Sequence, residues 1–220
     1  MKRFWMTALL LTGSLLVASK EAAAQNAFTL QSPDKRIQVS IRVGDRLRYD
    51  VIVKGKTLLQ DSTMSLKVDQ SVLGRSPRVK SSKESSYDQI VEPPVRQKFA
   101  KIREHYNELR LEMEMRYAVV FRAFNEGVAY RFETALPQEQ VKIYAEEVAF
   151  SFVGNNETYF PEEEIFFSHS ERKYLPRFLT QIPARSIATL LAIVIANDGT
   201  KIAIAESDVE DYPGMWLRGT

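Results

Sequence analysis

The chain has 220 residues, of which 45% are hydrophobic and 26% are charged, and its formal net charge is +2. This composition is ordinary for a globular protein, and the near-neutral charge gives no electrostatic reason to expect nucleic acid or an anionic membrane as a partner. The lack of cysteine excludes disulfides and a lipid anchor at a cleavage-site cysteine, so a hydrophobic core must stabilise the fold.

The first 24 residues have the pattern of a secretory signal peptide. Lys2 and Arg3 supply a positive start, an apolar run follows from Phe4 to Ala18, and the small residues Ala22-Ala23-Ala24 end the segment. The apolar run is shorter than the roughly 20 residues that a membrane-spanning helix needs. We therefore predict export to the periplasm with cleavage after this segment, and a mature domain over 25–220 that has no membrane-spanning stretch.

Apolar residues alternate with polar ones in the first part of the predicted domain. They occupy every second position in 36–43, and the pattern returns in 47–53 after the break at Gly44-Asp45. Because a strand places successive side chains on opposite faces, these two segments are predicted to form a hairpin with one buried face. The stretch 71–103 is rich in serine, proline and charge, and is predicted to be a loop region with short edge strands.

The strongest strand signal runs from Leu109 to Phe121, where seven apolar residues occupy alternate positions. A helix would spread these residues around its circumference, whereas a strand places all seven on one side. Helix propensities differ by only tenths of a kcal/mol among such residues, so the pattern decides, and one continuous strand is predicted. Asn125-Glu126-Gly127 then predicts a turn, with glycine able to take a positive φ, and 128–134 is predicted to be the partner strand.

The last third of the chain continues the β pattern. The stretch 141–152 predicts a strand pair or a strand and a turn. Asn197-Asp198-Gly199 is a strong hairpin signal between the apolar segments 187–196 and 201–206. With no helix longer than about two turns predicted, the expected fold class is all-β, an antiparallel β-sandwich.

Few of the residue patterns that carry chemistry occur here. There is no cysteine nucleophile and no G-x-S-x-G motif, and His105 and His169 lack the spacing of metal ligands. The run Glu162-Glu163-Glu164 is interpreted as a solvated acidic stretch rather than a metal site.

Two segments, 159–174 and 206–215, combine acidic, aromatic and turn residues in a way that core packing does not require. Carboxylates beside carbonyl-rich loops suit a hard cation such as Ca²⁺, and exposed aromatic rings suit stacking on sugars. Composition alone favours the interpretation of both segments as surface loops whose charges pair locally.

A family resemblance is carried by these same residues. The runs SHSERKY at 168–174, ESDVEDYPGM at 206–215 and FRAFNEGVAYRF at 121–132, with LQSPD at 30–34 as a first strand, together resemble the N-terminal domain of glycoside hydrolase family 97. The resemblance covers essentially all of 25–220. ESDVEDYPGM is the most specific of these runs, and all four occur in the order expected for the family.

The resemblance implies an antiparallel β-supersandwich of the galactose-mutarotase type that packs against a (β/α)₈ barrel. It implies an exported α-glucosidase or α-galactosidase with Ca²⁺ at its active site, and catalytic carboxylates on the barrel, which is expected to continue beyond Thr220. By motif position, Glu171 is the predicted Ca²⁺ ligand of this domain. Because Ca²⁺ takes 6–8 oxygen ligands, the domain alone is expected to bind Ca²⁺ weakly or not at all.

Two other functions are compatible with the same residues. A free-standing carbohydrate-binding module would bind sugars without the barrel. A mutarotase-like enzyme would need a pair of histidines and a carboxylate that converge on the sugar ring, and His105 and His169 are predicted to lie in dissimilar loops. The favoured prediction is a non-catalytic module of an α-glycosidase, with carbohydrate and the catalytic barrel as its partners.

Overall fold

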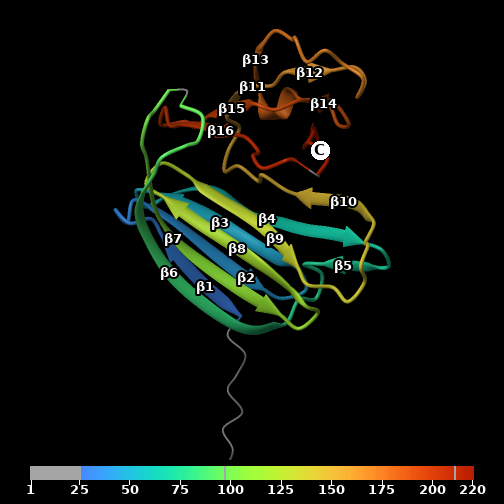
Figure 1. Cartoon of the computed structure of the whole chain (residues 1–220). Coiled ribbons are helices and arrows are strands. Elements are labelled where there is room, and N and C mark those ends of the chain that lie inside the picture. Colours follow the sequence, from blue (N-terminus) through green and yellow to red (C-terminus); the bar gives the residue numbers. More distant parts are fainter. Residues whose placement is uncertain (1–25, 97, 211) are drawn as a thin grey trace, which may run out of the picture.

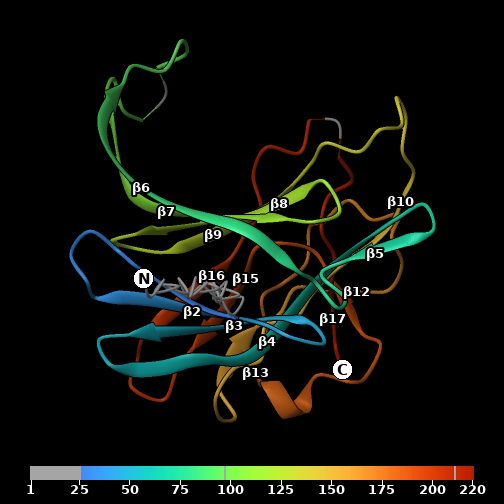
Figure 2. The ribbon, with the colours of Figure 1, turned by 90° about the horizontal axis from the view of Figure 1, so that it is seen from below.

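The computed structural model describes residues 26–96, 98–210 and 212–220 (Figure 1). Its main body is a pair of antiparallel sheets packed face to face (Figure 2). The first sheet has the order β1-β2-β3-β4-β10, with β5 paired to β4, and the second has the order β6-β7-β8-β9. The first comprises β1 (Ala27–Gln31), β2 (Ile37–Val43), β3 (Leu47–Val53), β4 (Lys56–Val68), β5 (Ser71–Leu73) and β10 (Ile143–Val148). The second comprises β6 (Val79–Val91), β7 (Ile102–Met113), β8 (Tyr117–Phe124) and β9 (Val128–Thr134).

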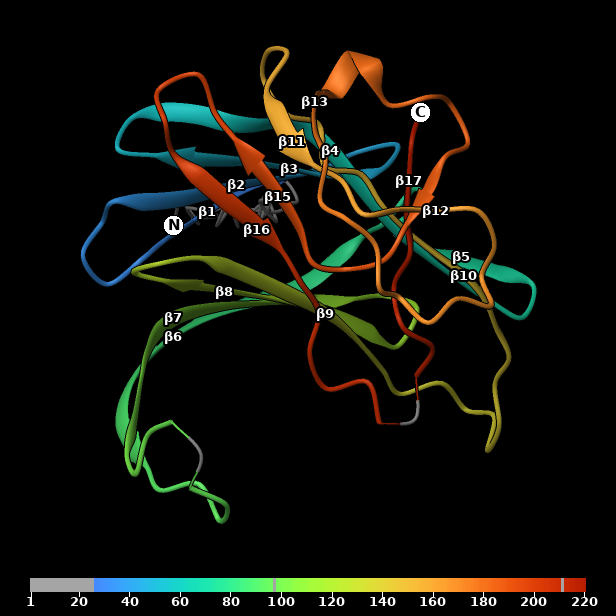
Figure 3. The same ribbon diagram turned by 90° about the horizontal axis from the view of Figure 1, so that it is seen from above.

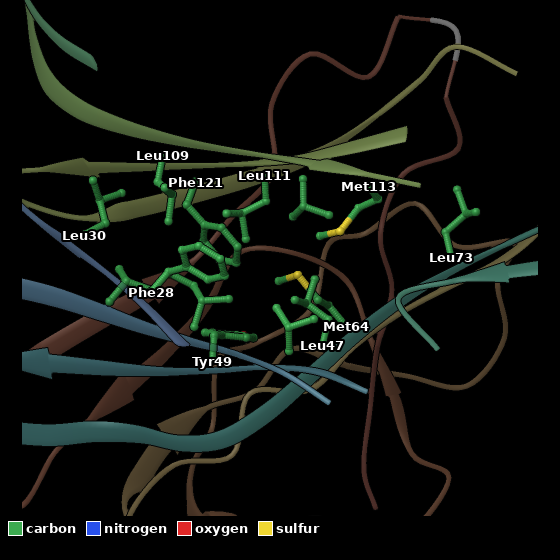
Figure 4. Packing of buried hydrophobic residues seen from close by; sticks show 14 of the residues in the cluster. Phe28, Leu30, Leu47, Tyr49, Met64, Leu73, Leu109, Leu111, Met113 and Phe121 are labelled. Carbon is green, nitrogen blue, oxygen red and sulfur yellow. The ribbon is translucent and has the colours of Figure 1, made fainter. Parts of the chain in front are cut away.

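The hydrophobic core fills the space between the two sheets (Figure 4). Phe28 and Tyr49 from the first sheet lie against Leu111 and Phe121 from the second, and all four are buried. Each such side chain contributes about 1.5–3 kcal/mol when it is fully removed from water. The apolar alternation in the sequence of β2 explains why this strand contributes to the core, since every second residue from Ile37 is on the same face and is buried.

The hairpins predicted from alternation and turn residues are confirmed. β2 pairs with β3, and β8 pairs with β9 across the turn at 125–127. That turn is closed by a hydrogen bond from Phe124 N to Gly127 O, and Gly127 does not adopt the positive φ that was expected. The stretch 141–152 yields a single strand, β10, which pairs with β4. The predicted antiparallel β-supersandwich is thus confirmed.

The single strand predicted over 109–121 is wrong, because the segment is two strands joined by a turn. β7 ends at Met113 and β8 begins at Tyr117, directly opposite it. Arg116 takes a left-handed φ of 55°, and Met115 lies in the turn, 51% exposed. Met113 and Tyr117 are four positions apart and both face the core. The period of two therefore runs through the turn unbroken and hides it.

The prediction of a loop region with short edge strands over 71–103 is right about the edge strands but wrong about their length. β6 is thirteen residues long and pairs along its whole length with β7, from Val79 opposite Met113 to Val91 opposite Ile102. β6 is the edge strand, and most of its residues are exposed, so it carries no apolar alternation. The outer ends of β6 and β7 form an arm that curves away from the sandwich (Figures 2 and 3).

Two small antiparallel sheets form the C-terminal part of the chain, beside β4 and β10 (Figures 1 and 3). One has the order β13-β11-β15-β16, and the other β12-β14-β17. The predicted hairpin at 197–199 joins β15 to β16, and a salt bridge from Lys56 to Asp198, 3.0 Å long, ties this hairpin to β4. The strands are β11 (Glu157–Tyr159), β12 (Glu162–Glu163), β13 (Pro176–Phe178), β14 (Ile187–Ala188), β15 (Ala192–Ile195), β16 (Lys201–Ile204) and β17 (Leu217–Arg218).

The helical content of the described residues is one 3₁₀ turn, Leu179–Gln181, which agrees with the prediction of no helix longer than about two turns. In the part of the chain that the structure describes, no helix is both long and apolar enough to cross a membrane. The predicted signal peptide over 1–24 lies outside the described residues.

Candidate functional site

A cleft of about 780 Å³ opens between β12, β14 and the loop 164–175. Its walls carry four acidic and four basic side chains with a few apolar ones, so its charge is balanced. The lining residues are Phe160, Glu162, Glu163, Glu164, Glu171, Arg172, Lys173, Leu175, Arg177, Arg185, Ser186 and Ile187.

Glu163 is the most deeply placed charged residue of the cleft. Glu163 is only 4% exposed, and its Oε2 accepts a hydrogen bond from Arg172 Nε at 2.7 Å. The Arg172 guanidinium is the main reason why the pKa of the Glu163 carboxyl is lowered, and the nearby Ser168 side chain adds to this effect. The other oxygen, Oε1, is buried and has no partner of normal hydrogen-bond geometry among the described residues.

The interpretation of 162–164 as a solvated acidic run is wrong for two of its three residues. Glu163 is buried, and Glu162 accepts hydrogen bonds from Arg177 Nη1 at 2.8 Å and from Ser186 Oγ at 2.6 Å. Only Glu164 is exposed. The reason is that Glu162 and Glu163 form β12, a strand of a small sheet, so their carboxylates point to opposite faces and each meets its own partners, from 9 to 24 residues away.

Glu171, the predicted metal ligand, lies in the loop that forms one wall of the cleft. Its backbone N donates to His169 Nδ1 at 3.2 Å, and Ser170 N donates to Ser168 Oγ at 3.0 Å. These two bonds fold the loop into consecutive tight turns, with Ser170 at a left-handed φ of 59°. The Glu171 side chain is exposed and forms no ion pair with any described residue.

The donor set around Glu171 is suitable for one ligand of a Ca²⁺ site but not for a complete one. No group of three or more His, Asp or Glu side chains in the described ranges could hold a metal ion. Ca²⁺ needs 6–8 oxygens, so most of them would come from elsewhere. The neighbouring Arg172 is neutralised by Glu163 and does not oppose a cation in full, while Lys173 has no such partner among the described side chains. The two histidines lie apart in the fold, because His105 is on β7 rather than in the predicted loop.

The second segment that the sequence singled out, 206–215, makes structural contacts. Both Glu206 carboxylate oxygens accept the backbone N–H of Met215, at 2.8 and 2.7 Å. The Tyr212 hydroxyl donates to Glu146 Oε2 at 2.7 Å, and the Tyr130 hydroxyl donates to the other oxygen, Oε1, at 2.7 Å. Burial is the main cause of a raised pKa at both tyrosines.

This tyrosine–glutamate cluster, Tyr130, Glu146 and Tyr212, joins β9, β10 and the C-terminal segment. Sequence reasoning missed it because its members are 16 and 66 residues apart. Two of the exposed aromatic rings, Phe166 and Phe167, lie in the loop beside the cleft instead. Phe167 is 94% exposed, and Phe166 contacts Trp216 edge-on, with ring centroids 5.0 Å apart.

Fold and cleft together define an antiparallel β-sandwich domain with a charged cleft at one side. Residues 30–220 match the sequence profile described as "Glycosyl-hydrolase 97 N-terminal". The chain therefore belongs to the N-terminal domain family of glycoside hydrolase family 97, as its sequence motifs predicted.

The known relatives of the chain are larger proteins. It is 31% identical to a protein of Bacteroides thetaiotaomicron named "Retaining alpha-galactosidase", over 88% of this chain and 30% of that relative. A solved glycoside hydrolase family 97 enzyme from Pseudoalteromonas sp. strain K8, in complex with acarbose, has a TM-score of 0.75 and 22% identity, over 87% of this chain and 30% of that chain. A crystal structure of β-arabinopyranosidase has a TM-score of 0.74 and 19% identity, and the match covers 88% of this chain and 33% of that chain. The identities of 22% and 19% to these two solved structures show the shared fold alone. The chain thus spans about a third or less of the proteins it resembles.

Proposed function

We propose that this chain is the N-terminal, non-catalytic module of an exported α-glycosidase that acts on an α-galactoside or an α-glucoside. The observation that carries the proposal is the family match over 30–220, in a chain that spans 30% of a relative named as an α-galactosidase. The signal-peptide pattern of the first 24 residues supports export to the periplasm. The module supports a catalytic barrel and forms one side of its active-site mouth.

In this proposal the charged cleft is the side of the module that faces the substrate. Glu171 offers one carboxylate to a shared Ca²⁺ ion, and the barrel supplies the remaining oxygens. When bound, such an ion would polarise a sugar oxygen as a Lewis acid. The exposed Phe167 ring offers an apolar face to a sugar, and the ion-paired Glu162 and Arg177 hold the wall of the cleft in place. The pair of carboxylates whose separation sets inversion or retention belongs to the barrel.

Hydrolysis and binding assays on this chain test the proposal. The chain alone is expected to hydrolyse neither p-nitrophenyl α-galactoside nor p-nitrophenyl α-glucoside, and to bind Ca²⁺ weakly or not at all in calorimetry. Measurable hydrolysis, or submicromolar Ca²⁺ binding by the chain alone, would contradict it. The coding sequence after Thr220 gives a further test, because a continuing barrel supports the proposal and a stop codon opposes it.

The alternative of a free-standing carbohydrate-binding module makes a different prediction. It requires measurable heat when maltose, melibiose or longer α-glucans are titrated into the chain, whereas the proposed module gives a flat titration. A mutarotase-like activity would be detected by polarimetry, and catalysed mutarotation would replace the proposal.

A further inference from the structure

The loop that carries Glu171 is held by a buried charge that sequence reasoning had placed in solvent. We propose that Glu163 is a positioning residue for Glu171: through Arg172 it fixes the loop 164–175 so that the Glu171 carboxylate is directed at a cation in the cleft. This inference rests on the proposed function for the cation itself, and adds a residue that acts on the site without touching the metal.

The first step is that the backbone of Glu163 is itself fixed. Glu163 pairs with Ile187 in the antiparallel ladder of β12 and β14, and β14 is paired on its other side with β17. The preceding residue, Glu162, is bonded to Arg177 and Ser186. The small sheet thus gives the Glu163 carboxylate a rigid base.

The second step is that Glu163 closes the loop next to Glu171. Arg172 follows Glu171 directly, and its Nε reaches the Glu163 carboxylate at 2.7 Å, so the two ends of the segment 163–172 are joined. Within that closed segment, Ser168 and His169 accept the two backbone hydrogen bonds that shape the turns before Glu171. Three constraints therefore act on a loop that would otherwise be free at its surface end.

The third step is that stability alone gives no reason to keep this carboxylate. Replacing a buried ion pair by apolar residues of similar volume is often neutral or stabilising. Glu163 carries the additional penalty that Oε1 is buried and lacks a hydrogen-bond partner among the described residues. Departures from the local rules of stability concentrate at functional sites. Residues that hydrogen-bond directly to a metal ligand change metal affinity by about 10- to 100-fold when they are mutated. Glu163 acts through Arg172, one residue further away, so an effect at the lower end of this range is expected.

The test measures metal binding by the whole chain, with no assay of hydrolysis. Tb³⁺, which substitutes for Ca²⁺, is titrated in the millimolar range and detected by luminescence sensitised by nearby aromatic rings, and Ca²⁺ then displaces it. We expect Glu171→Gln to abolish the displaceable signal and Glu163→Gln to weaken binding by about 10-fold, which leaves a signal that can still be displaced. The matched control is Glu108→Gln, which removes a part-buried ion pair with Arg122 on the second sheet, 2.8 Å long, and should leave the affinity unchanged.

A second variant keeps a folding defect from being mistaken for the proposed role. The double variant Glu163→Leu/Arg172→Leu replaces the buried pair by apolar side chains, and it is expected to keep the melting temperature of the parent chain while it weakens Tb³⁺ binding to the same extent as Glu163→Gln. Parent-like affinity in both variants, while Glu171→Gln loses binding, would overturn the positioning role and leave the proposed function intact. A parent chain with no displaceable signal would also overturn the positioning role alone. A parent signal that Glu171→Gln does not change would instead overturn the calcium role of Glu171.

Discussion

The sandwich core and the charged cleft lie in one chain but are stabilised in different ways. Between the two sheets, apolar side chains such as Ile41 and Phe121 are removed from water, and the sheets hold them in register. At the cleft, the chain is held by discrete polar pairs, among them Glu163 with Arg172 and Glu162 with Arg177. A core of this kind tolerates few changes of volume, whereas a partly exposed pair such as Glu162 with Arg177 can lose one member at small cost in stability. Stability is therefore concentrated in the sandwich, and the cleft is free to carry function.

The largest effect is expected from a substitution that breaks the core. Phe121→Ala removes a buried ring that packs against Tyr49 and Tyr130, with centroids 6.2 and 6.3 Å away. It should lower the free energy of unfolding by about 3–5 kcal/mol, measured by urea denaturation. The control is Phe167→Ala beside the cleft, which should change the free energy of unfolding by less than about 0.5 kcal/mol. Similar losses in the two variants would show that the cleft loop is as important to stability as the core.

An intermediate effect is expected where the two regions meet. Glu146→Ala leaves the hydroxyls of Tyr130 and Tyr212 without their acceptor, so the free energy of unfolding should fall by about 1–3 kcal/mol. Glu147, at the next position of β10, is as exposed as Glu146 but accepts neither tyrosine hydrogen bond, so Glu147→Ala should be close to neutral in the same denaturation experiment. Equal stabilities for the two variants would mean that the tyrosine–glutamate cluster does not hold the C-terminal segment to the sandwich.

A smaller effect is expected within the cleft. Arg177→Ala removes one partner of Glu162, which keeps its hydrogen bond from Ser186. We expect a loss of about 1 kcal/mol or less, which shrinks further as salt screens the pair in the parent chain. Unfolding curves at low and high ionic strength provide the measurement. A loss as large as that of Phe121→Ala would contradict the contrast between the two regions.

The smallest effect concerns the acid side of the stability profile. The hydrogen bond from Ser32 is the main reason why the pKa of Asp34 is lowered from 3.8 to about 2, with further help from Arg36. Because the folded chain holds this carboxyl ionised more strongly than the unfolded chain does, its contribution is complete above pH 3.8 and is lost as the pH falls through about 2. Asp34→Asn should flatten the dependence of unfolding free energy on pH in this window. An unchanged slope would assign the acid sensitivity to other carboxyls.

The fold was predictable where a strand has one buried face, because apolar residues then occupy every second position in the sequence. β2 and β3 show this period, and so do β7 and β8, although the turn at 114–116 preserves it and so escaped detection. β6 was missed because an edge strand with exposed residues has no apolar face to reveal it. Strand pairing with β7 alone determines its conformation.

The cleft was predictable only through the family motif. The run 168–174 located the loop that lines it, but the partners of Glu163 and Glu162 could not be read from neighbouring residues. Ion pairs across 9 and 15 positions depend on how β12 meets the following loop and β13, and composition does not record that geometry. The metal role of Glu171 stays a prediction.

The long arm of β6 and β7 has a consequence for how copies of the protein behave towards one another. β6 ends its sheet, so thirteen residues present one side of their backbone to solvent, which is a template for pairing with a strand of another molecule. Charged side chains along it, such as Lys80, Lys83 and Glu84, and the curvature of the arm oppose such pairing. The polar composition that concealed this strand in the sequence is thus the same property that opposes edge-to-edge aggregation of crowded copies of the chain.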